Sequence, residues 1–276
     1  MELGIFAKTF PDLGAQPSLR VVRDAGFSTA QFNLACLGLP SMPDAIDDDI
    51  TAQIAEASRS TGVGIAGISG TYNMAHPDAK VRKASRVGFQ NVVSAAREMG
   101  APVVSLCTGS RDPHDMWKFH PENDSDEAWK DLRSELEFAL RVAQEAGIHL
   151  AIEPEPANVI HDARAAKRIL NEMASSHLGI LLDAENLLTP ETLSRQHAVI
   201  DEATRLLGGA LLLAHAKDIN ASGQVVAPGE GAVNLPAFTK ALRRVGYDDA
   251  LIAHGFAAEK AGVAAKVLQR IIGESA

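Results

Sequence analysis

The sequence of 276 residues has only two cysteines, Cys36 and Cys107, and no long apolar run. Two cysteines cannot build a disulfide framework, and such scarcity is typical of proteins from a reducing compartment. Every apolar run is shorter than the roughly 18 residues that a membrane span requires. The first residues also lack the basic and apolar regions of a signal peptide. The sequence therefore predicts a cytoplasmic protein with no membrane partner.

The chain also has no excess of positively charged residues. The chain has 26 Lys and Arg residues against 35 Asp and Glu residues, which gives a formal net charge of −9. A negative protein repels phosphate backbones, so nucleic acid is not an expected partner. No GxGxxG motif follows the first apolar run, which disfavours a dinucleotide-binding doubly wound sheet. The apolar content of 46% and charged content of 22% are those of an ordinary globular protein.

One pattern repeats along the chain: an amphipathic stretch ends at a glycine, a short apolar run follows, and a polar cluster comes next. Glycine is common just past a helix end because it adopts positive φ without a steric clash. The apolar runs are predicted to be parallel strands buried on both faces. They cover residues 3–6, 29–32, 63–69, 102–107, 148–152, 178–182, 210–214 and 250–253. The predicted helices cover residues 16–25, 48–61, 79–99, 126–146, 162–174, 190–206, 235–245 and 259–273.

These elements form eight strand–helix units, and the chain length matches a closed barrel of roughly 250 residues. We therefore expect residues 1–276 to form one domain, a single (β/α)8 TIM barrel. An open doubly wound α/β sheet is the alternative. In such a barrel the chemistry lies at the carboxyl ends of the strands.

Four side chains that commonly bind metals end four successive predicted strands: Glu153, Asp183, His215 and His254. Neighbouring barrel strands lie about 4.8 Å apart, so inward-leaning side chains at one level can converge on one ion. Carboxylate and imidazole ligands together suit a divalent first-row metal. The alternative is that each residue is a solvated polar cap. Four ligand types at equivalent points favour a shared metal site.

Four short segments stand in the second half of this eight-unit pattern: IEPEP at 152–156, LDAE at 182–185, HAKD at 215–218 and GEG at 229–231. With the pattern itself, they resemble the xylose isomerase-like sugar (phosphate) isomerase/epimerase TIM-barrel family over roughly residues 2 to 272. The resemblance implies a divalent metal held by Glu153, Asp183, His215 and, in place of the family's second glutamate, His254. It also implies an isomerase, epimerase or related lyase that acts on a sugar, polyol or keto acid through an enediolate.

The substitution of His254 for glutamate bears on the mechanism. In the family's epimerases two glutamates exchange protons with opposite sides of the substrate carbon, whereas a metal-bound imidazole has no free lone pair. Glu153 is therefore the predicted base, with Lys217, Glu155 or His120 as alternative second proton donors. A ligand-binding barrel that has lost two-base catalysis is the alternative function.

A long segment after the fourth strand, residues 108–123, is long enough to act as a functional lid. In it, Trp117 is placed to stack on a sugar face and Arg111 to pair with a carboxylate or phosphate. The alternative is a solvated loop anchored by one buried tryptophan. The predicted substrate-binding residues are Asn73, His76, Arg111, Trp117, His120, Glu155 and Asn186, and the predicted catalytic residues are Glu153 and Lys217.

The ligand set also indicates which metal to expect. A neutral imidazole at His254 makes the site less negative and softer than a third carboxylate does. The expected cofactor is one divalent ion, namely zinc, manganese, cobalt, iron or nickel rather than magnesium. The expected partner is a small carbohydrate-like molecule, and a homo-oligomer is compatible with a barrel of this size. Abasic-site endonucleases resemble the family but gather more histidines around three metals, so the acidic chain argues against that activity.

Overall fold

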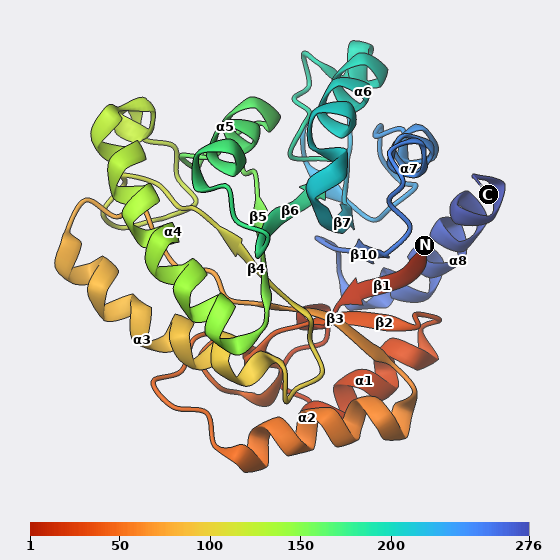
Figure 1. Cartoon of the computed structure of the whole chain (residues 1–276). Coiled ribbons are helices and arrows are strands. Elements are labelled where there is room, and N and C mark those ends of the chain that lie inside the picture. Colours follow the sequence, from red (N-terminus) through yellow and green to blue (C-terminus); the bar gives the residue numbers. More distant parts are fainter. Residues whose placement is uncertain (276) are drawn as a thin grey trace.

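The apolar runs form parallel strands that close into a barrel (Figure 1). The computed structural model describes residues 1–275. The barrel strands are β1 (Glu2–Phe6), β2 (Thr29–Phe32), β3 (Gly64–Ser69), β4 (Val103–Cys107), β5 (His149–Glu153), β6 (Leu178–Asp183), β7 (Leu211–Ala216) and β10 (Ala250–Ala253). Their order is β1-β10-β7-β6-β5-β4-β3-β2, and β1 closes the barrel by pairing with β10. The predicted (β/α)8 barrel is confirmed.

Eight α-helices within the described residues surround the barrel, one after each barrel strand (Figure 1). They are α1 (Ala15–Asp24), α2 (Asp48–Thr61), α3 (Ala79–Ala96), α4 (Asp126–Ala146), α5 (Ala163–Met173), α6 (Gln196–Leu207), α7 (Leu235–Arg244) and α8 (Ala261–Glu274). The short 3-10 helices are η1 (Ala7–Thr9), η2 (Leu34–Leu37), η3 (Pro121–Asp124), η4 (Leu193–Arg195), η5 (Gly208–Ala210) and η6 (Ala258–Lys260). None of the helices in residues 1–275 is long and apolar enough to cross a membrane.

Two helix boundaries differ by three residues or more from those predicted. The sixth helix begins at Gln196 instead of residue 190. There, Thr192 hydrogen-bonds through its hydroxyl to the backbone of Thr189, and such local bonds compete with helical ones. The third helix ends at Ala96 instead of residue 99. Helix α4 shows the predicted boundaries, with Ser125 accepting a bond from the Ala128 N–H at its start and Gly147 at φ 67° after its end.

The apolar core has two parts. The larger part fills the space between the strands and the helices. The smaller part lies inside the barrel and contains Val103, Ala151, Leu181, Leu213 and Ile252, each from a different strand. Because side chains alternate along a strand, the residue two positions further on also faces inward. This periodicity places Ser105, Glu153, Asp183, His215 and His254 one level above the apolar interior.

A small hairpin that the sequence did not indicate follows β7. Strands β8 (Asp218–Ile219) and β9 (Val225–Val226) pair antiparallel. The hairpin brings Val225 and Val226 to the edge of the cavity described below.

Candidate metal centre and active site

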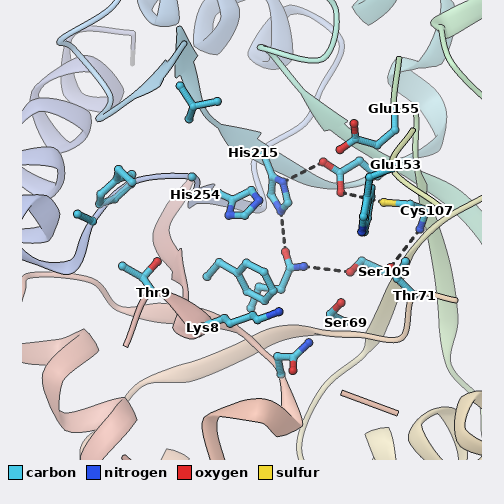
Figure 2. Close-up of a pocket in the computed structure, with 18 of the residues that line it drawn as sticks. Lys8, Thr9, Ser69, Thr71, Ser105, Cys107, Glu153, Glu155, His215 and His254 are labelled. Carbon is cyan, nitrogen blue, oxygen red and sulfur yellow. Dashed lines mark hydrogen bonds and ion pairs between the residues drawn. The ribbon is translucent and has the colours of Figure 1, made fainter. Parts of the chain in front are cut away.

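Three of the predicted ligands lie together at the carboxyl ends of β5, β6 and β7, and Figure 2 shows two of them, Glu153 and His215. A ligand atom from each of Glu153, Asp183 and His215 lies within 4.8 Å of the other two. His215 Nδ1 is 3.2 Å from Glu153 Oε1 and 3.5 Å from Asp183 Oδ2. Two ligand atoms each about 2.1 Å from a tetrahedral ion are themselves about 3.4 Å apart. The spacing therefore fits one metal ion.

Two buried atoms of this cluster lack hydrogen-bond partners within the described residues. They are His215 Nδ1 and Asp183 Oδ2. A buried polar atom without a partner costs about 1–3 kcal/mol, and more for a charged group. Both atoms face the point where an ion would lie, so the donor set fits a divalent metal by chemistry as well as by distance.

Gln31, on β2, fixes the orientation of His215. Its amide nitrogen donates to Ser105 Oγ at 3.0 Å, which leaves its oxygen to accept from His215 Nε2 at 2.7 Å. With the proton on Nε2, the lone pair of His215 Nδ1 points at the two carboxylates. Such outer partners commonly orient metal-binding histidines. The sequence reasoning missed Gln31, although a glutamine inside a buried strand, two residues after Thr29, was the available signal.

The electrostatics of the site favour a cation. Burial would lower the pKa of His215, but the carboxylates of Glu153 and Asp183 raise it to about 9. Burial would raise the pKa of Asp183, but the Lys217 ammonium and His215 lower it to about 2. Burial and the neighbouring Glu153 raise the pKa of Glu155 to about 7. The site therefore holds more negative charge than the nearby cationic side chains neutralise.

His254, the predicted fourth ligand, lies beside the cluster but does not belong to it at the 4.8 Å limit. Its ring centroid is 5.1 Å from that of His215 and 5.1 Å from that of Phe6. Burial and the nearby His215 lower the pKa of His254 to about 4, so its imidazole is neutral. It lines the cavity (Figure 2), and its role as a ligand stays a prediction.

Lys217 and Asn186 contact the carboxylates of Asp183 and Glu153, respectively. Lys217 Nζ lies 2.6 Å from Glu185 Oε2 and 3.9 Å from Asp183 Oδ2, and these carboxylates raise its pKa against the effect of burial. The amide nitrogen of Asn186 donates to Glu153 Oε1 at 3.2 Å. Lys217 also donates to Asn186 Oδ1 at 3.4 Å. Both residues therefore orient Glu153 and Asp183.

A cavity of about 1020 Å³ opens above the cluster. Glu153, Glu155, His215 and His254 line one side, and polar side chains in or just after the first four strands line the other (Figure 2). The polar set is Lys8, Thr9, Gln31, Asn33, Ser69, Thr71 and Ser105. Phe6, Trp117 and Phe256 add aromatic surface. Hydroxyl-binding groups beside apolar rings suit a small polyhydroxylated molecule.

The other residues predicted to bind substrate lie around the loop after β4. Trp117 lines the cavity and is 52% exposed. Asn73 exchanges hydrogen bonds with the backbone of Ser110, and His76 Nε2 donates to the Pro113 carbonyl at 3.2 Å. His120 Nδ1 accepts from a backbone N–H at the start of η3. Of this loop group, Trp117 alone lines the cavity among the described residues.

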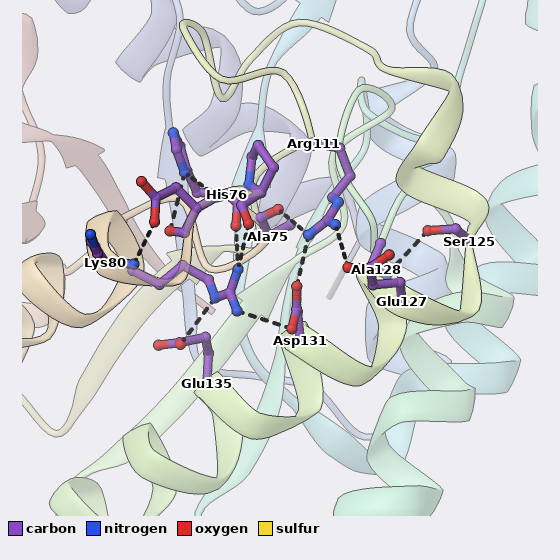
Figure 3. A network of polar contacts seen from close by, with 12 residues as sticks. Ala75, His76, Lys80, Arg111, Ser125, Glu127, Ala128, Asp131 and Glu135 are labelled. Carbon is purple, nitrogen blue, oxygen red and sulfur yellow. Dashed lines mark hydrogen bonds and ion pairs between the residues drawn. The ribbon is translucent and has the colours of Figure 1, made fainter.

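Arg111 belongs to an ion-pair network (Figure 3) and is not one of the residues that line the cavity. Its guanidinium is buried and lies 2.8 Å from Asp131 Oδ2 on α4, while it also donates to the carbonyl of Ala75. Arg82 joins Asp131 and Glu135 in the same network. The guanidinium of Arg111 thus ties the loop after β4 to α4, and its role in substrate binding stays a prediction.

The HAKD and GEG segments meet in one structural feature. Asp218 Oδ2 accepts from the backbone N–H groups of Gly229 and Gly231, and its Oδ1 accepts from that of Val233. A Cβ at Gly231 would lie 2.2 Å from Asp218 Oδ1, so only glycine fits there. The carboxylate therefore shapes the loop that brings Glu230 to the cavity.

Replacing Asp218 by alanine is expected to lower the free energy of unfolding by about 3 kcal/mol or more. Asp218 is fully buried, so its loss leaves the backbone N–H groups of Gly229, Gly231 and Val233 without an acceptor. Asp218→Asn retains an acceptor oxygen and should lose about half as much. Urea unfolding of both variants measures this, with exposed Asp249→Ala as the matched control. A loss for Asp218→Ala equal to that of the control would contradict the role.

The profile of a family described as xylose isomerase-like TIM barrel matches residues 19–271. A search of curated proteins finds no match. Among solved structures, a D-tagatose 3-epimerase-like protein has a TM-score of 0.78 at 18% identity, covering 100% of this chain and 98% of that chain.

Two further structures are similar. The 3-keto-D-glucoside 4-epimerase YcjR from E. coli has a TM-score of 0.78 at 17% identity, covering 98% of each chain. The IOLI protein with a bound zinc atom has a TM-score of 0.76 at 18% identity, covering 100% of this chain and 99% of that chain. At such identities the likeness establishes a common fold.

Proposed function

Because the chain belongs to the xylose isomerase-like TIM-barrel family, we propose that it is a divalent-metal-dependent isomerase or epimerase of a small carbohydrate. The observation that carries the proposal is the cluster of Glu153, Asp183 and His215 with its two unpartnered buried atoms. Glu153 and His215 of this cluster line the cavity. Two of the similar structures are named as sugar epimerases or like them, and a third is named with zinc, which supports both parts of the proposal.

Glu153, Asp183 and His215 would hold the metal, which when bound acidifies a carbon next to a carbonyl by drawing electrons from the oxygen. Glu153 then acts as the base. Its Oε1 faces His215 and accepts from Asn186, whereas its Oε2 accepts from Cys107 Sγ at 3.6 Å. Because neither His215 nor Asn186 contacts Oε2, we assign to this oxygen the removal of the proton from the substrate carbon.

The direction of proton return decides the reaction. If Glu153 returns the proton on the same face to the former carbonyl carbon, and the proton of the neighbouring hydroxyl passes to the former carbonyl oxygen, the carbonyl moves by one carbon and the reaction is an isomerisation. Inversion needs a donor on the opposite face, and a neutral His254 replaces the glutamate that provides it in the family's epimerases. Lys217 is occupied by Glu185, whereas Glu155 lines the cavity. Glu155 therefore has better access to a substrate than Lys217, but its carboxylate lies within 4.8 Å of a Glu153 oxygen, so it suits proton transfer on the same face and favours isomerisation over inversion.

Proton exchange tests this function. The protein loaded with zinc or manganese is incubated with a panel of ketoses in deuterated water, and deuterium at the carbon next to the carbonyl is followed by NMR. Exchange with at least one ketose supports the enzyme. Tight binding of a ketose without exchange would support instead a binding barrel, which the neutral imidazole of His254 favours.

Gln31→Leu is expected to weaken metal binding about 10- to 100-fold, because His215 loses the acceptor that fixes its tautomer. Competition with a chromogenic chelator measures the affinity. Gln16→Leu, on the exposed face of α1, is the matched control. Equal affinities of Gln31→Leu and wild type would remove Gln31 from the metal centre.

A further inference from the structure

We propose that the active site contains a second metal position, formed by Cys107, Glu155 and the outer oxygen of Glu153, that takes a thiophilic divalent ion such as zinc or cadmium. The inference rests on the proposed function, since Glu153 is shared with the first position. It assigns a role to the one cysteine that lines the cavity within the described residues.

The distances fit such a position. One ligand atom from each of Cys107, Glu153 and Glu155 lies within 4.8 Å of the other two. Cys107 Sγ is 3.6 Å from Glu153 Oε2. A sulfur about 2.3 Å and an oxygen about 2.1 Å from a tetrahedral zinc are about 3.6 Å apart. The thiol and the carboxylate oxygen therefore already stand at the separation of two zinc ligands.

The carboxylate of Glu153 links the two positions. Its Oε1 lies 3.2 Å from His215 Nδ1, whereas its Oε2 faces Cys107. Each oxygen thus belongs to a different ligand group. A bridging carboxylate of this kind is compatible with ions about 3.5–4 Å apart, as in two-metal centres.

The ligand types differ between the positions. The first offers nitrogen and oxygen, while the second adds a soft sulfur, which selects zinc or cadmium over manganese and magnesium. Cys107 is only 4% exposed, but all three ligands of the second position line the cavity, so an ion enters from there. Binding replaces the thiol proton, which passes to solvent.

Occupancy of the second position has a consequence for the base. An ion on Glu153 Oε2 uses the lone pair to which we assign proton transfer. Excess zinc or cadmium should then suppress proton exchange that one equivalent of metal supports. The second position would therefore act as an inhibitory site for thiophilic metals.

Cadmium titration tests the proposal, because cadmium bound to thiolate gives a charge-transfer absorption in the ultraviolet. Wild type is expected to bind two equivalents and to develop this absorption as the position that contains Cys107 fills. Cys107→Ser should bind one equivalent without absorption. Cys36→Ser is the matched control, since Cys36 lies buried in η2, and it should behave as wild type.

Glu155→Gln provides a second variant that retains the thiol. Even an outer partner contributes about tenfold to metal affinity, so loss of a direct ligand should weaken the second equivalent at least about tenfold. One equivalent in wild type, no absorption at two equivalents, or unchanged absorption in Cys107→Ser would each overturn the proposal. If one of these outcomes is found, proton exchange by the protein with a single equivalent of metal bound would still support the proposed function. Two equivalents of cadmium bound to wild type, with no exchange when a single equivalent of metal is bound, would overturn the proposed function alone.

Discussion

Glu153→Gln is expected to lower the rate of proton exchange by about 10³-fold or more, within the 10²–10⁴-fold range of a general base and with some metal lost besides. The amide cannot take a proton from carbon, although its oxygen can still contact a metal. Rates with each ketose that wild type turns over, at saturating metal, give the effect directly.

Metal content measured on the same samples separates the two roles of Glu153. A variant that holds metal but does not exchange protons identifies Glu153 as the base. Glu145→Gln, on the exposed surface of α4, makes the same chemical change away from the site and should leave the rate unchanged. Wild-type rates in metal-loaded Glu153→Gln would exclude it from the mechanism.

Zinc or manganese is expected to raise the thermal midpoint of the protein by about 5 °C or more at a free concentration 100-fold above the dissociation constant. Binding to the folded state alone adds about 2.7 kcal/mol under that condition. For chains of roughly this size, 1 kcal/mol shifts the midpoint by about 2–4 °C. The stabilisation arises because the ion provides a partner for the unpartnered atoms of Asp183 and His215.

Asp183→Asn should abolish most of this shift, since the neutral amide removes one of the two charged ligands. The comparison is between each protein with chelator and the same protein with metal, so an effect of the substitution on intrinsic stability cancels. Asp249→Asn, which is exposed, is the matched control. A full shift in Asp183→Asn would place the metal elsewhere.

The barrel could be predicted from the sequence because each of its strands is marked by a pattern of a few neighbouring residues. Each strand is a short apolar run, and each candidate ligand ends such a run, so Glu153, Asp183 and His215 could be identified from position alone. The same reasoning failed at the start of α6, where a turn at Thr189 and Thr192 delays the helix.

Other features depend on contacts that no local pattern reveals. Gln31 meets His215 across 184 residues of sequence. The direction of the Arg111 guanidinium is set by Asp131 on a later helix, and Asn73 is occupied by the backbone of Ser110. The residue types were informative, but the tertiary partners decide whether a polar side chain faces the cavity or holds a loop.

The position of Gln31 has a consequence for how the metal centre assembles during folding. Asp183 and His215 are paired in register on β6 and β7, and Glu153 ends the adjoining β5, so one half of the barrel carries all three ligands. Gln31 comes from β2, which joins that half only through the rest of the sheet. Full metal affinity therefore requires ring closure between distant segments, a slow kind of step in folding. In refolding experiments, metal uptake should lag behind the recovery of helical circular dichroism.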